Sequence, residues 1–282
     1  MTHEQGALPA GPPARYPNFA GKHAEEAMFT PADFVAYLRR TGALADYEAP
    51  AGVILCYQRP LYEHVLRAEE ITAGERRKTA HGLILLPSCD GRVGLMGGFG
   101  IGAPGAVAVL EDLAALGTRR FVSIGTAGSL QRDLAVGSLV VCESAVRDEG
   151  VSHHYLPPAR LAAADPGLTA RLRAALARAG RGCRAGTSWT IDTPYRETVA
   201  EARHYRDEGV LCVEMEAAAL FAVGQVRGLQ VASAVVISDS LAELVWDPQF
   251  DGPHVHAGLV AWYDAAVAAL RETPGGAADA AE

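Results

Sequence analysis

Long hydrophobic runs are missing from this sequence: no stretch stays apolar over the roughly 20 residues that a membrane-spanning helix needs. A stripe of lysine and arginine is missing too, and 25 basic residues are outnumbered by 33 acidic ones. Proteins that follow a nucleic-acid backbone carry such a stripe. We therefore expect neither a membrane nor a nucleic acid as a partner. The first 15 residues have no apolar core, so we expect no signal peptide or anchor there.

Closely spaced cysteine pairs are also absent. The five cysteines form no Cys-x-x-Cys motif and are scattered as Cys56, Cys89, Cys142, Cys183 and Cys212. Structural zinc sites and disulfide frameworks need cysteines at short, regular spacing. We expect reduced, mostly buried thiols in a cytoplasmic protein, and no metal site.

Short apolar runs alternate with amphipathic segments along the chain. Strands are predicted at 53–57, 82–87, 92–96, 121–124, 138–142 and 231–237, and helices at 31–40, 61–70, 104–116, 166–180, 195–207, 214–227 and 254–271. Because the strand runs are apolar on both faces, a mixed sheet covered by helices is expected. The pattern predicts a single α/β domain at 31–272, after a partly disordered extension at 1–30 and before a disordered tail at 273–282.

A glycine-rich turn at 100–105 reads Gly-Ile-Gly-Ala-Pro-Gly and fits the pattern G-x-G-x-x-G. In a dinucleotide-binding oxidoreductase this turn approaches a pyrophosphate, and an acid about 20 residues later binds the ribose. No Asp or Glu lies between Arg119 and Gln131, and the turn follows a predicted hairpin, which disfavours that function. A plain tight turn remains open. A turn that lets the backbone approach a sugar or a phosphate fits best.

A second turn of small residues, at 125–128, follows the strand predicted at 121–124. Ligands of open α/β sheets bind at the carboxyl ends of strands, where free backbone N–H groups are available. This turn is therefore a second candidate for ligand contact.

Two glutamates, Glu214 and Glu216, interrupt an apolar stretch at 210–223 that we predict to open a buried helix. A helix N-terminus accommodates one acid easily and two less well. A carboxylate accepts two hydroxyl donors, so it suits the vicinal diol of a ribose. Asp239, which follows the strand at 231–237, is either a helix cap or a general acid whose pKa is raised by burial.

Four motifs now stand in order: Gly100-Ile101-Gly102, Gly125-Thr126-Ala127-Gly128, Val213-Glu214-Met215-Glu216 and Ser238-Asp239. In these motifs and their spacing, from about Val53 to Leu270, the chain resembles the purine nucleoside phosphorylase/uridine phosphorylase family, which also contains nucleosidases. The segment 145–155 looks most like the uridine phosphorylase branch. The resemblance implies a three-layer fold around a nine-stranded, mixed and partly closed sheet. It also implies homodimers or homohexamers with sites shared between subunits.

The resemblance implies a role for each candidate residue. The sugar-binding residues are then Glu216, Met215, Glu214, Ile101 and a subunit-lent His23, and the base-binding residues are Tyr195, Asp192 and Arg196. Glu216 would hold the ribose diol, and Asp239 would protonate the departing base. Purine-cleaving members carry an Asp there, whereas typical uridine phosphorylases carry an Asn. No cofactor is implied, because phosphate is a co-substrate.

The expected nucleophile pocket departs from the family pattern. Family members hold phosphate with an arginine in a Gly-Asp-Pro-x-Arg loop, and here Tyr62 takes that arginine's position, while Ser123 replaces a second arginine. Losing two charge-assisted hydrogen bonds weakens phosphate binding about a hundred- to ten-thousand-fold unless other arginines substitute. The residues expected around the nucleophile are Gly100, Gly125, Thr126, Ser123, Arg59 and Arg147, with Arg76 and Arg77 as further substitutes.

The leading hypothesis is a pentosyltransferase that cleaves the N-glycosidic bond of a nucleoside with phosphate. The alternative is a nucleosidase that uses water, although the glutamate-rich motif of that branch is absent around Glu63. A nucleoside-binding protein without turnover and a dinucleotide oxidoreductase are the remaining alternatives.

Overall fold

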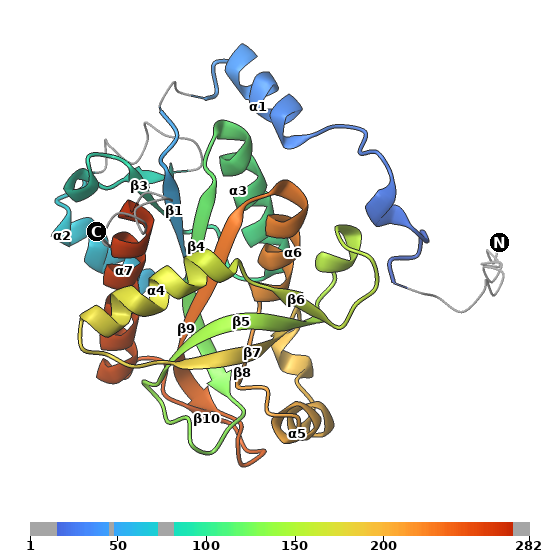
Figure 1. Ribbon diagram of the computed structural model, residues 1–282, viewed down its shortest axis with the longest axis vertical. Coiled ribbons are helices and arrows are strands. Elements are labelled where there is room, and N and C mark those ends of the chain that lie inside the picture. Colours follow the sequence, from blue (N-terminus) through green and yellow to red (C-terminus); the bar gives the residue numbers. More distant parts are fainter. Residues whose placement is uncertain (1–15, 45–47, 73–81, 273–282) are drawn as a thin grey trace, which may run out of the picture.

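A mixed sheet of ten strands lies at the centre of the computed structural model, which describes residues 16–44, 48–72 and 82–272 (Figure 1). In this described part the strands are β1 Gly52–Cys56, β2 Ile84–Leu85, β3 Val93–Gly97, β4 Arg120–Ser129, β5 Leu139–Asp148, β6 Leu161–Ala163, β7 Arg184–Ile191, β8 Cys212–Glu214, β9 Gln230–Ser240 and β10 Asp247–Pro248. Their order is β10-β9-β5-β7-β8-β4-β1-β3-β2, and β6 pairs with β5.

Part of this sheet closes on itself. Strand β9 pairs with β5 on one edge and with β4 on the other, and β8 joins β4 to β7. Since β5 also pairs with β7, the five strands β4, β9, β5, β7 and β8 form a ring. The α/β fold with a mixed, partly closed sheet is thereby confirmed. The resemblance implied nine strands, and the described residues form ten.

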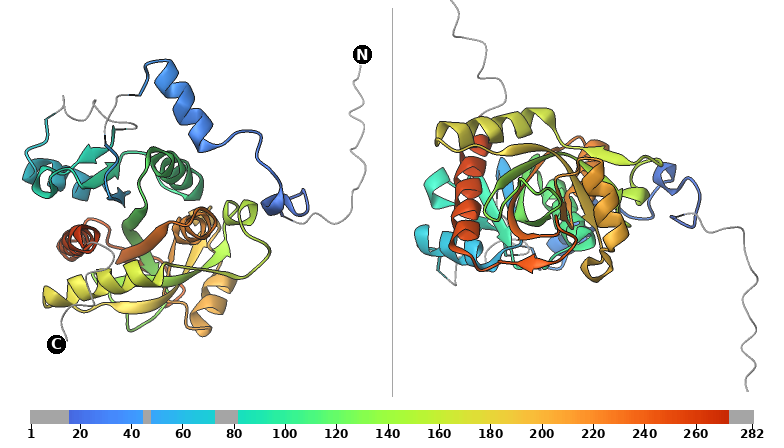
Figure 2. Two further views of the ribbon diagram at one scale, coloured as in Figure 1. Left: turned by 45° about the horizontal axis from the view of Figure 1, so that its top comes forward. Right: turned by 90° about the horizontal axis from the view of Figure 1, so that it is seen from below.

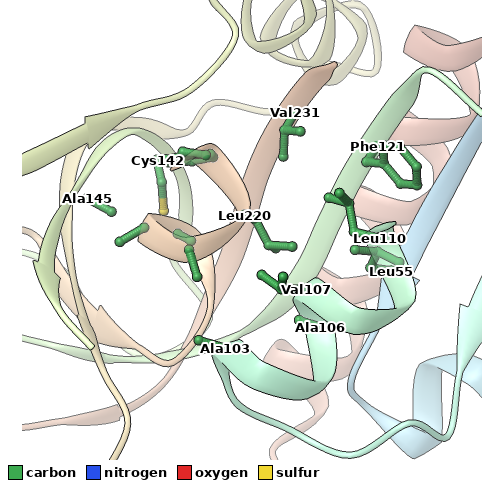
Figure 3. Packing of buried hydrophobic residues seen from close by; sticks show 14 of the residues in the cluster. Leu55, Ala103, Ala106, Val107, Leu110, Phe121, Cys142, Ala145, Leu220 and Val231 are labelled. Carbon is green, nitrogen blue, oxygen red and sulfur yellow. The ribbon is translucent and has the colours of Figure 1, made fainter. Parts of the chain in front are cut away.

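Helices cover the sheet on both sides (Figures 1 and 2). They are α1 Pro31–Arg40, α2 Arg59–Ala68, α3 Ala103–Leu116, α4 Pro166–Arg178, α5 Val199–Asp207, α6 Ala217–Arg227 and α7 Pro253–Arg271. Helices α3 and α6 share one buried apolar cluster with the sheet, and α2, α4 and α7 share another. Leu220 of α6 lies beside Val107 of α3 within the first cluster (Figure 3). The two clusters make a three-layer architecture, which holds the sheet rigid beneath the site.

Local signals in the sequence set several helix boundaries. Thr30 and Asp33 form a reciprocal capping box at the start of α1, as the Thr30-Pro31 pair predicts. Asp165 accepts a hydrogen bond from the backbone of Leu168 at the start of α4. Helix α3 ends at Gly117, whose φ of 125° is accessible to glycine. The hairpin predicted around residues 88–91 is confirmed by the antiparallel pairing of β2 with β3.

Two predicted helices begin later than the sequence indicates. The segment predicted as a helix at 195–207 is a 3-10 turn, Pro194–Arg196, followed by α5 from Val199, because Thr198 caps α5 with Glu201. The helix predicted from Glu214 begins at Ala217. Glu214 instead ends strand β8, which pairs with β4 and β7, so the prediction that both glutamates open a helix is wrong.

The carboxyl ends of strands β1, β4 and β9 lie together, because these three strands are parallel and adjacent. The turn after β1, the second half of β4 and the Ser238-Asp239 pair of β9 therefore meet at one edge of the sheet. Strand β8 brings Glu214 to the same place through its pairing with Gly128 and Ser129. Among the described residues, none of the helices has the length and apolar character that crossing a membrane requires.

Candidate active site

A cavity of about 540 Å³ opens at this edge of the sheet. It is lined by Tyr57, Gln58, Ile101, Ser123, Gly125, Thr126, Ala127, Gly128, Pro194, Tyr195, Glu197, Val213, Glu214, Met215, Glu216, Ser233, Val235, Ser238, Asp239, Leu241, Trp246 and Phe250. Its volume suits a ligand of nucleoside size. The cavity brings together eight of the residues predicted from the sequence, namely Ile101, Ser123, Gly125, Thr126, Tyr195, Glu214, Met215 and Glu216, and the predicted acid Asp239.

Glu216 is a buried carboxyl in the wall of the cavity. It lies at the N-cap position of α6, and its Oε1 accepts a hydrogen bond of 2.5 Å from the backbone N–H of Gly102. Burial raises the pKa of Glu216 to about 8, and the negative charge of Glu214 adds to this shift. The donors to this carboxyl are backbone N–H groups, those of Gly102 and Met215. A buried carboxyl in a cavity wall is a natural acceptor for ligand hydroxyls.

Glu214 is held differently, since both of its oxygens accept hydrogen bonds from the protein. Its Oε1 accepts from the hydroxyls of Ser188 and Thr190, and its Oε2 accepts from the backbone of Glu216 and Ala217 at 2.8 and 2.7 Å. Burial nevertheless raises its pKa. These contacts fix the turn between β8 and α6, so Glu214 holds the backbone from which the Glu216 side chain projects.

The glycine-rich turn reaches the cavity through its middle. Gly100 and Gly102 have φ values of 91° and 96°, which glycine adopts without strain. The turn exposes Ile101 to the cavity and places Gly102 about 4 Å from Met215, measured from an ideal Cβ position to the Met215 Cε. The glycines thus serve close approach to the Glu216 carboxyl rather than to a pyrophosphate.

Asp239 also lies in the cavity wall, near the end of β9. Its Oδ1 accepts a hydrogen bond of 2.7 Å from Ser238, and its Oδ2 accepts one of 3.0 Å from the indole N–H of Trp246. Burial raises the pKa of Asp239, while these two donors lower it. The net shift is upward, as a group that donates a proton near neutral pH requires.

Glu197 is a cavity residue that the sequence reasoning missed. Burial raises the pKa of this carboxyl to about 7, and the nearby charge of Asp239 adds to the shift. No hydrogen bond to its side chain occurs within the described parts of the chain. One signal in the sequence could have found it. The Thr198-x-x-Glu201 capping box marks the start of a helix, and Glu197 is the residue immediately before it, in the turn that leads into the helix.

The predicted nucleophile pocket is lined by neutral polar groups. The hydroxyl of Tyr57 lies 3.1 Å from that of Ser123, and the amide of Gln58 donates to Thr126 at 2.9 Å. Burial raises the pKa of Tyr57 well above its ordinary value, and Glu216 adds to this, so the phenol stays neutral. Among the described residues that line the cavity there is no lysine or arginine.

The predicted arginines lie elsewhere. Arg59 is on the surface at the start of α2, where it pairs with Glu63 at 2.7 Å and its side chain is 86% exposed. Arg147 is buried and donates to Ser152 and to backbone carbonyls of residues 152, 156 and 157, so it stabilises that loop. Arg76 and Arg77 fall outside the described residues. The structure does not bring Arg59, Arg147 or Gly100 into the cavity wall.

The three predicted base-binding residues do not lie together in the structure. Tyr195 lies at the cavity mouth and is 99% exposed. Asp192 accepts a hydrogen bond from the backbone of Gly150, and Arg196 faces a neighbouring surface hollow. His23 is in the 3-10 turn Lys22–Ala24 and does not line the cavity of its own chain.

Candidate metal ligands do not gather in the described residues, where no group of three or more His, Cys, Asp or Glu side chains is placed to hold an ion. The five cysteines are free, and four of them are buried, as predicted. The site therefore consists of carboxyl, hydroxyl, amide and aromatic groups.

A family model for the phosphorylase superfamily matches residues 60–269. The chain belongs to the phosphorylase superfamily. This match spans the three strands that line the cavity, β4, β8 and β9, and it confirms the family that the four motifs indicate.

Named relatives within the phosphorylase superfamily include enzymes for different bases. The chain is 31% identical over 142 residues to a guanosine phosphorylase of Halorubrum lacusprofundi, covering 50% of this chain and 59% of the relative. It is 30% identical over 161 residues to a uridine phosphorylase of Haemophilus influenzae, covering 51% and 64%. A DeoD-type purine nucleoside phosphorylase of Bacillus cytotoxicus is 30% identical over 146 residues, covering 51% and 62%. The matches thus span about three fifths of these relatives.

Proposed function

We propose that the protein is a nucleoside phosphorylase, which transfers the pentose of a nucleoside to phosphate. The observation that carries this proposal is the presence, in the wall of one cavity, of two buried carboxyls with raised pKa values, Glu216 and Asp239. The names of the three relatives support the same activity. No cofactor is needed, because phosphate is the second substrate.

The proposed reaction uses the cavity residues as follows. Glu216 accepts hydrogen bonds from the sugar hydroxyls, with Met215 and Ile101 beside the ring. The C1′–N bond breaks as Asp239 transfers a proton to the base, which leaves as a neutral molecule. A phosphate oxygen forms the new bond to C1′ from the opposite face. The products are the free base and a pentose 1-phosphate.

We further propose that the base is a purine whose edge carries N–H donors, as in guanine. Glu197 supports this, because its cavity-facing carboxyl has no hydrogen-bond partner among the described residues and accepts two such donors when ionised. Tyr195, Trp246 and Phe250 provide aromatic surface beside it. Glu197→Gln is expected to lower kcat/KM for guanosine about 10- to 100-fold and for uridine much less. The surface variant Glu243→Gln is the matched control.

The decisive experiment is a panel of nucleosides incubated with and without phosphate. Pentose 1-phosphate that forms only when phosphate is supplied supports the proposal. Turnover of none of the nucleosides under either condition contradicts it and favours a binding protein.

The alternative function, hydrolysis, is tested by the same panel. The nucleophile end of the cavity holds the neutral groups of Tyr57, Gln58, Ser123 and Thr126, and no described cation lines it. Such an end accommodates water without the cost of pairing a phosphate dianion. Free pentose released in the absence of phosphate, at a rate that phosphate does not raise, identifies this function.

We also propose a homo-oligomer in the cytoplasm, with residues 31–272 as its catalytic domain. The N-terminal segment lies outside the two helical layers and exposes Phe19, Met28 and Phe29, an apolar set that a second copy would cover (Figure 2). The free cysteines suit a reducing compartment. Light scattering after size-exclusion chromatography measures the assembly, and a monomer contradicts it.

A further inference from the structure

The indole N–H of Trp246 is bonded to the acid that the mechanism needs. Trp246 lies in the segment between β9 and α7, next to β10, and its Nε1 is 3.0 Å from Asp239 Oδ2. Trp246 as a whole is 60% exposed, yet its N–H donates to this carboxyl. The other two tryptophans are fully buried and bond to Asp148 and to the carbonyl of Val235. Trp246 is thus the exposed tryptophan that points its donor into the site.

The strand pairing fixes this contact. Pro248 of β10 lies opposite Asp239 in the antiparallel ladder, and Asp247 lies opposite Ser240. Trp246, just before β10, also contacts Phe250, just after β10, and their ring centroids are 6.3 Å apart. The Phe250 ring therefore packs against the indole. A backbone ladder and a ring contact together hold the indole in one orientation.

An indole N–H can only donate a hydrogen bond. It stabilises a carboxylate oxygen more than the corresponding neutral acid, because the bond to the ionised group is stronger. Ser238 is the second donor to Asp239. Burial and the negative charge of Glu197, on the turn before α5, have the opposite effect and make the Asp239 carboxylate less stable. Glu214 and Glu216 are the remaining acids in the cavity wall, and Gly128 and Leu241, the nearest groups on the other sides, carry no charge.

We propose that Trp246 is a positioning residue for Asp239, whose indole N–H orients the carboxyl toward the departing base and stabilises the carboxylate left after proton transfer. The inference rests on the proposed function for its catalytic consequence. The contact itself can be tested in the free protein. The proton moves from Asp239 to the base nitrogen as the C1′–N bond breaks, and Trp246 keeps its own proton throughout.

The first test uses tryptophan fluorescence of the full chain without substrate. Ionisation of Asp239 changes the hydrogen bond to Trp246, so the emission of Trp246, taken as the difference between the wild type and Trp246→Phe, should titrate with pH. The difference is needed because Trp189 donates to the carboxyl of Asp148 and adds a pH-dependent signal of its own. In the Asp239→Asn background the same difference should not titrate. Phe34→Leu, on α1 and outside the cavity wall, is the matched control and should retain the titration. An unchanged titration in Asp239→Asn overturns the contact.

The second test compares pH–rate profiles. Activity needs protonated Asp239 and is lost as the pH rises through its pKa. Removing the donor in Trp246→Phe makes the carboxylate less stable, so the alkaline limb should move up by about half to one pH unit. The kcat should fall about 10-fold at neutral pH. Phe34→Leu, on α1 and outside the cavity wall, is the control and should keep the limb at the wild-type pH.

The two proposals fail in different ways. A limb that stays in place in Trp246→Phe, in an enzyme whose wild type cleaves nucleosides, overturns the role of Trp246. A wild type that cleaves no nucleoside overturns the proposed function, and the fluorescence titration then still decides whether Trp246 reports on Asp239.

Discussion

At the scale of single residues, the cavity wall carries four carboxyls whose pKa values are raised by burial. The charge of Glu214 adds to the shift of Glu216 and the charge of Asp239 to that of Glu197, whereas hydrogen-bond donors oppose the shift at Glu214 and Asp239. Titratable groups shifted toward neutral pH cluster where proton transfer or ligand binding takes place. The residue scale therefore yields predictions about pH.

The stability of the folded state should depend on pH through Glu216. Its pKa is raised from 4.5 to about 8, so the folded protein holds a proton that the unfolded chain releases. This contribution is fully present below pH 4.5 and is lost as the pH rises through about 8. Glu216→Gln keeps a neutral side chain at every pH. The Tm of the variant minus the Tm of the wild type should therefore be roughly 5 °C larger at pH 9 than at pH 5. Thermal melts of both proteins at pH 5 and pH 9 check this. A Tm difference between variant and wild type that is the same at the two pH values contradicts it.

At the scale of the element, the turn between β8 and α6 depends on hydrogen bonds from a neighbouring strand. Thr190 of β7 donates to Glu214 and accepts from the backbone N–H of Ala218 at 3.0 Å. One hydroxyl thus connects a strand end, a buried acid and a helix start. The turn places Glu216, so its geometry decides where this carboxyl lies in the cavity wall.

Thr190→Val should destabilise the protein by about 2–3 kcal/mol, because it removes one of the two hydroxyl donors to the buried Glu214 Oε1 and leaves the backbone N–H of Ala218 without its side-chain partner. Thr118→Val is the matched control. Thr118 is also fully buried, but its hydroxyl has no hydrogen-bond partner among the described residues, so the substitution should change stability by at most about 0.5 kcal/mol. Chemical denaturation measures both. Equal losses in the two variants contradict the prediction.

At the scale of the whole molecule, the ring of strands brings distant segments into contact. Gly128 of β4 lies at a register shift against β9, where a Cβ atom would stand 2.5 Å from Leu241 Cδ1 and 3.0 Å from Asp239 Oδ2. The site thus requires that no side chain project from Gly128. This requirement links two strands that are about 110 residues apart in the sequence.

Gly128→Ala should displace Asp239 and lower kcat about 100-fold, since small misplacements of a reacting group have effects of that order. Gly182→Ala is the matched control, because a Cβ there meets no atom within 4 Å. Steady-state kinetics with the substrate found in the nucleoside panel measures the loss, and circular dichroism checks the fold. A Gly128→Ala enzyme with wild-type kcat contradicts the prediction.

Much of the fold could be predicted from the sequence, because its signals are local. The runs at 53–57 and 231–237 are apolar on both faces and became buried strands β1 and β9. Strand β7, Arg184–Ile191, was missed because its small and polar residues have no apolar run, and it is held by pairing with β5 and β8. Strand β8 was missed because three residues are too short for a periodic pattern.

The sequence by itself determined the α/β class, the four motifs and three of the acids in the cavity wall, Glu214, Glu216 and Asp239, because each depends on residue type and spacing. Only the tertiary structure decided what each acid does. It bonded Glu214 inside the protein and directed Glu216 to the cavity. It brought Glu197 and Trp246 to Asp239, and it left Arg59 and Arg147 outside. The reason is that partners and burial are set by contacts between strands far apart in the chain, which local patterns do not encode.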